Sequence, residues 1–85
     1  MAYQLYVSSN RGKHYTKRKI EKILSKRHEG FSLVPITGYW KGRREASWLI
    51  IIEDELEKVY FSVMELQIAL KQEVIGWQEV PTITF

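Results

Sequence analysis

The stretch RGKHYTKRK, residues 11–19, combines five formal cations and a histidine within nine residues. It lies between a run with strand character and a run with helical spacing, so it is predicted to surround a helix N-terminus. Cations are unfavourable there, because the helix dipole and the free N–H groups already present positive charge. A bound anion would offset that repulsion, and Gly12 would let the main chain approach the anion closely.

This stretch therefore predicts a phosphate or carboxylate site, and the alternative is a solvated basic face with flexible lysines. The stretch lacks the GxxxxGK[ST] spacing of a nucleotide-hydrolysing phosphate loop, so nothing in it specifies ATP hydrolysis. The candidate ligand-binding residues are Arg11, Lys13, His14, Tyr15, Lys17 and Arg18.

A second group of candidate residues lies in GYWKGRREASW, residues 38–48, where aromatic side chains alternate with bases. Aromatic rings stack on nucleobases, and arginine forks bind phosphate oxygens in pairs. This mixture predicts nucleotide binding, although tryptophans that flank a hairpin are also common as cross-strand core pairs. The candidates here are Tyr39, Trp40, Lys41, Arg43 and Arg44.

Little in the sequence indicates catalysis. His14 and His28 are predicted at opposite ends of one helix, roughly 20 Å apart at 1.5 Å per residue, so they cannot share a site within one chain. The chain has no cysteine, no histidine and carboxylate cluster with metal-ligand spacing, and no serine beside an evident base. We expect a protein that is not an enzyme and that needs no cofactor or metal.

The order of apolar runs and turns predicts strand, helix, strand, strand, helix, strand. Strands are expected at about 3–9, 31–40, 46–53 and 77–85, with helices at about 16–28 and 55–73. Thr16 is the expected N-cap of the first helix, and Gly42 allows a tight hairpin between the middle strands. This order is that of the ferredoxin-like βαββαβ fold, an α+β domain with a four-stranded antiparallel sheet and two helices on one face. Residues 1–85 form a single such domain.

In this topology the loop after the first strand and the hairpin before the third lie at the same end of the sheet. Arg11, Lys13 and His14 are therefore expected to approach residues 39–44, within one chain or across an interface. Such a convergence would combine a helix N-terminus for phosphate with aromatic faces for bases.

Two apolar surfaces exceed what one small core needs. Residues 49–52 are apolar on both faces of a central strand, and the second helix carries an extra stripe opposite its core-facing one. Exposed apolar patches usually mark interfaces, so we expect a homo-oligomer. The alternatives are a monomer that exposes these side chains, or a tail that folds over the helix. The predicted interface residues are Phe61, Met64 and Ile68.

Charge is divided unevenly, with a formal charge of +6 over residues 1–30, +2 over 31–52 and −5 over 53–85, within a net charge of +3. The basic half favours an anionic partner, but two oppositely charged helices lying side by side would give the same pattern. No run of apolar residues approaches a membrane span or a signal peptide. We expect no membrane partner and a cytoplasmic location.

The stretches YQLYVSSNRGKHYTKRKIEKIL and EGFSLVPITGYWKGRREASWLIII resemble a group of small, mostly phage-encoded proteins with a ferredoxin-like or PII-like fold. The resemblance spans roughly residues 3–53, and it carries over Gly38, Trp40, Gly42 and Glu45 as markers of the hairpin. PII-like relatives bind nucleotides between subunits, and some small phage proteins sequester nucleotide signals of bacterial defence. A likeness to Cas2-like nucleases fails, because Asn10 stands where those proteins carry an aspartate.

The resemblance implies a phage-type anti-defence protein, in the host cell cytoplasm, that sequesters an anionic nucleotide such as a cyclic oligonucleotide at an oligomer interface. Two other functions use the same basic and aromatic residues. One is an RNA- or DNA-binding module, and the other is an anti-CRISPR-like antagonist of a bacterial defence complex.

Overall fold

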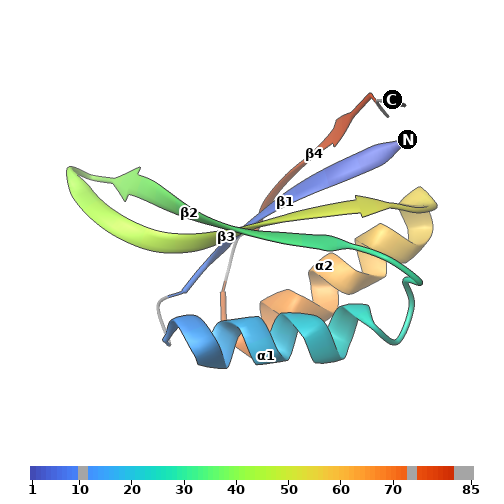
Figure 1. Ribbon diagram of the computed structural model, residues 1–85, viewed down its shortest axis with the longest axis horizontal. Helices are drawn as coiled ribbons and strands as arrows, with labels where there is room; N and C mark the ends of the chain where they lie inside the picture. The colour runs from blue at the N-terminus through green and yellow to red at the C-terminus, as the bar shows by residue number, and fades with distance from the viewer. Residues whose placement is uncertain (10–11, 73–74, 82–85) are drawn as a thin grey trace.

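The computed structural model describes residues 1–9, 12–72 and 75–81. Its elements are β1 (Ala2–Ser8), α1 (Lys13–Leu24), β2 (Ser32–Trp40), β3 (Arg43–Glu53), α2 (Leu56–Leu70) and β4 (Gly76–Val80). The strands form one antiparallel sheet in the order β2-β3-β1-β4. Both helices lie on the same face of this sheet (Figure 1). The predicted ferredoxin-like βαββαβ fold is confirmed.

The core lies between the sheet and the two helices. Every second side chain of the central strands β1 and β3 points toward the helices, and the strand register sets these side chains opposite one another. In β1, Leu5 pairs with Ile50 of β3 and both side chains are fully buried. Burying a side chain of this size contributes about 1.5–3 kcal/mol, so a few such pairs dominate the stability of a small domain. The other fully buried apolar side chains among the described residues are Val7, Ile20, Leu24, Ile52, Val59, Leu66 and Leu70.

Helix α1 begins earlier than the sequence predicts. Its N-cap is Gly12 at φ +102°, with no side-chain capping bond and no acid in the first turn. Thr16, the expected N-cap, instead lies inside the helix and is fully buried, and its hydroxyl has no hydrogen-bond partner within the described part of the chain. The N-cap prediction was wrong because Gly12 reaches a backbone conformation that threonine avoids. The helix also ends at Leu24, so His28 lies beyond it.

Helix α2 buries one stripe in the core. The helical spacing predicts Leu56, Val59, Val63, Leu66 and Leu70 for this stripe, and the structure differs at two positions. Ser62 is fully buried within it, between Val59 and Val63, whereas Leu56 at the helix start is 53% exposed. Position 56 belongs to the stripe by spacing, but it is the first residue of α2. The last predicted strand is present as β4, and its residues 82–85 lie outside the described part of the chain.

The face of the sheet away from the helices, called here the open face, is also apolar in its centre. Leu49 and Ile51 of β3 are partly exposed on it, beside Val34 of β2 and Tyr6 of β1, which are 38% and 43% exposed. Apolar side chains on both sides of a central strand are therefore present as predicted. Among the described helices, none is long and apolar enough to cross a bilayer.

Candidate anion-binding site

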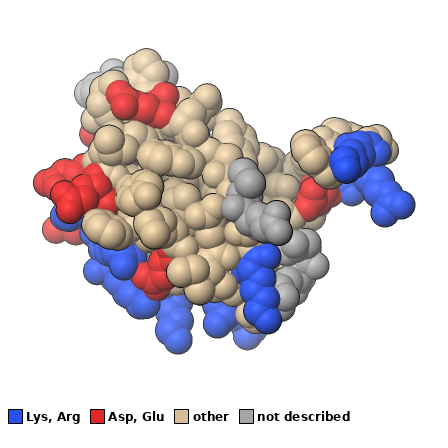
Figure 2. Space-filling view, turned by 180° about the vertical axis from the view of Figure 1, so that it is seen from behind, with Lys and Arg blue, Asp and Glu red and all other residues tan. Residues whose placement is uncertain are grey.

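The hairpin between β2 and β3 projects from the body of the protein. Strand β1 pairs with β3 only from Glu53 to Ser47, while β2 and β3 continue their own pairing to Trp40 and Arg43. The last pair therefore lies about 13 Å beyond the end of β1, at 3.3 Å per residue. Residues 37–46 form a two-stranded extension, called here the arm, which Figures 1 and 2 show standing clear of the sheet and helices.

The turn at the tip of the arm consists of Lys41 and Gly42. Both have positive φ, 49° and 75°, as in the type I′ turns that suit the twist of a two-residue hairpin. The sequence predicted a tight turn at Gly42, and this is confirmed. The turn is shorter than the predicted KGRRE connection, so Arg43, Arg44 and Glu45 are already part of β3.

Each face of the arm carries one aromatic residue opposite one arginine. The strand register pairs Trp40 with Arg43 on the side of the open face, and Tyr39 with Arg44 on the side of the helices. Tyr39 and Trp40 are 74% and 69% exposed, so neither belongs to the core. Lys41 adds a further cation, with its Nζ 5.9 Å from the centre of the Trp40 ring. The arm thus offers two flat rings and three cations to a ligand.

Hydrogen bonds from the end of β1 and the residue after it hold the base of the arm. The Ser8 hydroxyl of β1 donates to the carboxylate of Glu45, and the backbone N–H of Ser9 donates to the carbonyl of Ala46 at 3.0 Å. Trp48 is buried beneath the start of α1, and its Nε1–H points to the carbonyl of Lys13 at 3.4 Å. Of the two tryptophans in this stretch, Trp48 is therefore a core residue and Trp40 is a surface residue.

One cation of α1, Lys13, lies next to this base. Lys13 places its Nζ 5.5 Å from the centre of the Trp48 ring, and Lys19 lies 5.6 Å from the ring of Tyr15. Lys17 makes a loose, exposed contact of 4.0 Å with Glu21. The other predicted residues of this helix, His14 and Arg18, are exposed, and Arg11 lies outside the described residues.

The structure therefore brings the two predicted groups to the same end of the sheet, as antiparallel pairing requires. Within this arrangement Lys13 contacts Trp48, and Arg44 lies four residues from Trp48 on the same face of β3, about 13 Å along the strand. A ligand that touches both groups must span this distance. Ligand binding by these residues stays a prediction.

Hollows in the surface lie at the opposite end of β3. Two shallow depressions of about 440 and 470 Å³ share Glu53 as a lining residue. The first is also lined by Asp54 and Glu55, and the second by Glu29. Clustered carboxylates repel an anion, so these hollows do not suit the ligand that the arm would take.

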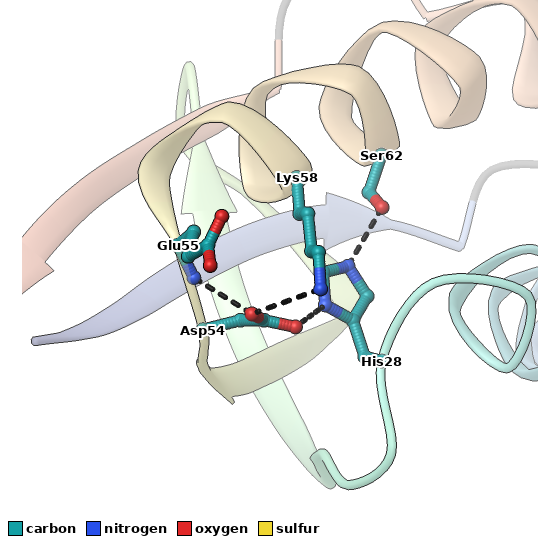
Figure 3. Close-up of polar contacts among 5 residues, drawn as sticks. All are labelled: His28, Asp54, Glu55, Lys58 and Ser62. Atoms are coloured by element: carbon teal, nitrogen blue, oxygen red, sulfur yellow. Dashed lines mark hydrogen bonds and ion pairs between the residues drawn. The ribbon is translucent and has the colours of Figure 1, made fainter.

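A buried polar chain that the sequence did not reveal lies near these hollows (Figure 3). His28 places Nδ1 2.7 Å from Oδ2 of Asp54 and Nε2 2.8 Å from Oγ of Ser62. The other Asp54 oxygen accepts the backbone N–H of Glu55 at 2.7 Å, and Lys58 lies 3.9 Å from it. The hydrogen bond from His28 and the one from Glu55 lower the pKa of the Asp54 carboxyl.

Serine, histidine and aspartate in this order are also the parts of a hydrolase triad. Here, however, Ser62 is fully buried in α2, and only 1% of the His28 side chain is exposed. A nucleophile must reach its substrate, so the arrangement fits a structural tie better than a catalytic site. It joins the loop after α1 to the start and the middle of α2.

Ion pairs also join α2 to the segment that follows α1. Glu65 of α2 pairs with Lys26 at 2.9 Å and with Arg27 at 2.8 Å, and both contacts lower the pKa of the Glu65 carboxyl. Part of the basic first half of the chain is thus neutralised internally, as the alternative explanation of the charge asymmetry proposed. The first turns of α1 and the arm keep their exposed cations, and Figure 2 shows basic side chains along the α1 edge and on the arm.

Comparisons with known proteins bear on the fold. No family model matches the sequence, and no curated protein matches it. Among solved structures, a DUF3240 family protein from Shewanella baltica is similar, with a TM-score of 0.61 and 16% identity over 98% of this chain and 96% of that one. CutA from Archaeoglobus fulgidus gives a TM-score of 0.66 and 18% identity, over 100% and 87% of the two chains.

A third similar structure is CPII, a nitrogen regulatory PII-like protein from Thiomonas intermedia, which is bound to ADP, AMP and bicarbonate. Its TM-score is 0.67 at 14% identity, over 93% of this chain and 87% of that one. At such identities the likeness concerns the fold alone. The chain therefore has the ferredoxin-like fold of small PII-like and CutA-like proteins.

Proposed function

We propose that this protein is a non-enzymatic, oligomeric binding protein that captures an anionic nucleotide with its arm. The observation that carries the proposal is the pair of exposed aromatic and arginine positions, Trp40 with Arg43 and Tyr39 with Arg44. A ring can stack on a base while the neighbouring guanidinium binds phosphate. Among proteins with a similar fold, CPII is bound to ADP and AMP.

Oligomerisation belongs to this proposal because the arm alone offers an open surface rather than a pocket. A two-stranded hairpin is marginally stable by itself, and its Trp40 side continues into the apolar open face with Leu49 and Ile51. A second copy that covers the open face would also enclose one side of the arm. The ligand would then lie at the boundary between subunits.

Ligand titration by tryptophan fluorescence tests the proposal directly, because Trp40 is exposed, whereas Trp48 is buried and Trp77 is partly buried against the core. The panel contains AMP, ADP, ATP and cyclic di- and trinucleotides, which include the cyclic oligonucleotide signals of the anti-defence hypothesis. Arg43→Ala and Arg44→Ala should each weaken binding by about 1–3 kcal/mol, the size of a hydrogen bond to a charged group. Lys22→Ala on α1 is the control and should bind like the unaltered protein. Equal affinities in all variants would refute nucleotide capture.

Nucleic acid is the second candidate ligand, favoured by the exposed cations along the first turns of α1. Binding to a nucleic acid should weaken steeply with salt, because each neutralised phosphate releases counterions. A nucleotide held by two or three contacts should show a shallower dependence. A log-log plot of affinity against salt therefore separates the two ligands. If neither ligand binds, antagonism of a protein complex is the better explanation of the basic surface.

A further inference from the structure

Helix α2 has an apolar surface that points away from the core. At 100° per residue, Tyr60, Phe61, Met64 and Ile68 lie within one sector of about 100°, called here the outer face of α2. Their side chains are 49%, 48%, 41% and 77% exposed. Tyr60 extends the stripe that the sequence predicted. A patch of this kind, with four large apolar side chains on one helix, usually marks an interface.

Charges stand at the two ends of the outer face and not within it. Glu57 is exposed in the first turn, and Lys71 is the exposed C-cap residue. Neither has an ion-pair partner among the described residues. The other charged residues of the helix, Lys58 and Glu65, face Asp54 and the segment after α1 instead. Figure 2 shows a broad uncharged area on this side of the molecule, bordered by acidic side chains where α2 begins.

The order of these residues is symmetric about Met64. Positions 57 and 71 lie equally far from it, and so do positions 60 and 68. The charged ends are about 21 Å apart along the helix, at 1.5 Å per residue. A second copy running antiparallel, with a two-fold axis at Met64, would place each Glu57 opposite a Lys71 and each Tyr60 opposite an Ile68.

We propose that α2 is the interface of a two-fold symmetric pair, in which the outer faces of two copies pack antiparallel about Met64. A parallel pair is less favourable, because it would bring Glu57 against Glu57. An anionic membrane is also a poorer partner, because the acidic end of the outer face would repel it. With roughly 100 Å² from each of four side chains per copy and a polar rim, the pair buries on the order of 1,000 Å² in total. This is the low end for specific interfaces, so we expect association at micromolar concentration.

This interface uses the helix layer, whereas the arm and the open face lie on other surfaces. The proposed pair is therefore independent of nucleotide capture, and the experiments below can confirm or refute it whether or not a nucleotide binds. If the open face also associates, the two interfaces together give a larger assembly than either one.

Charge reversal tests the antiparallel orientation. Glu57→Lys and Lys71→Glu should each weaken self-association about tenfold, because two opposite-charge pairs become like-charge pairs. Mixing the two variants should restore association, since every position 57 then faces an opposite charge at position 71. In native mass spectrometry of an equimolar, isotopically labelled mixture, mixed pairs should make up nearly all of the dimers, well above the half that random pairing gives. A statistical mixture, or no mixed pairs, would overturn the orientation.

Cross-linking tests the axis at Met64. The chain has no cysteine, so Met64→Cys introduces one thiol, which should give a covalent dimer on mild oxidation or with a short bis-maleimide. Lys58→Cys, on the other side of the same helix, is the matched control and should stay monomeric on a denaturing gel. In sedimentation, Met64→Asp should weaken association at least about 100-fold while the circular dichroism stays unchanged, because two carboxylates would meet in an apolar contact. Equal cross-linking of both cysteine variants, or an unchanged mass for Met64→Asp, would refute the interface.

Discussion

The buried chain from Asp54 through His28 to Ser62 predicts a large loss of stability when its carboxylate is removed. Asp54→Ala leaves the Nδ1–H of His28 without its partner at 2.7 Å, and His28 is almost fully buried. A hydrogen bond to a charged group contributes about 1.5–3 kcal/mol, and the Glu55 N–H loses its acceptor as well. We expect a loss of about 2–4 kcal/mol, which lowers Tm by about 10–25 °C in a domain of this size.

The pH dependence gives a second measurement on the same variant. The folded-state pKa of Asp54 is lowered, so the folded protein binds fewer protons at this site than the unfolded chain does near pH 4. The contribution of Asp54 is therefore fully present above the unfolded pKa of about 3.9, and it is lost as pH falls through the lower folded pKa. The difference in Tm between the unaltered protein and Asp54→Ala should shrink as pH falls below about 4.

Thermal unfolding followed by circular dichroism at pH 7 and at pH 3 is the assay. The control is Glu29→Ala, which removes an exposed carboxylate next to His28 and should change Tm by less than about 2 °C. Asp54→Asn should lie between the control and Asp54→Ala, because an amide oxygen can still accept from His28. An unchanged Tm for Asp54→Ala at pH 7 would show that the tie does not stabilise the fold. A Tm difference that is the same at both pH values would show that the charge of the Asp54 carboxylate does not contribute to this stability.

Further predictions concern the arm and the helix pair. Gly42→Ala places a side chain at φ +75° and should cost about 1–2 kcal/mol in chemical denaturation, with ligand binding weakened because the tip is distorted. Trp48→Ala should lose about 3–5 kcal/mol of stability as a core deletion, while Trp40→Ala should leave stability nearly unchanged and reduce nucleotide affinity; the reverse pattern would contradict their assignment. Glu65→Gln should lower Tm at pH 7 and have less effect in acid, because the Glu65 pKa is lowered by its contacts with Lys26 and Arg27.

The order of elements could be predicted because each element has a local pattern of its own. Alternation in residues 3–9, the apolar run at 49–52, helical spacing around Ile20 and Val59, and the tight turn at Gly42 depend on near neighbours in the chain. The boundaries were less certain, since the first helix starts at Gly12 through backbone freedom that no capping side chain announces. The exposed stripe on α2 was predicted for the same reason as the fold, because its spacing is local.

The candidate site was predicted in its residue types but not in its shape. The sequence identified Trp40, Arg43 and Arg44. It did not show that β3 extends beyond the end of β1 to form the arm, because that length depends on pairing between strands far apart in the chain. The same pairing decided that Trp48 is buried under Lys13 while Trp40 is exposed. From spacing alone the two tryptophans were equivalent.

By itself, the sequence determined the βαββαβ order, the basic and aromatic character of residues 38–48 and the apolar surplus on α2, since these depend on contacts a few residues apart. Only the tertiary structure decided that His28 meets Asp54 and Ser62, which lie 26 and 34 residues further along the chain. No local pattern marks such a set, because each residue alone is compatible with a loop or a helix surface. Their meeting depends on how the two helices dock on the sheet, and that docking is fixed by the whole core at once.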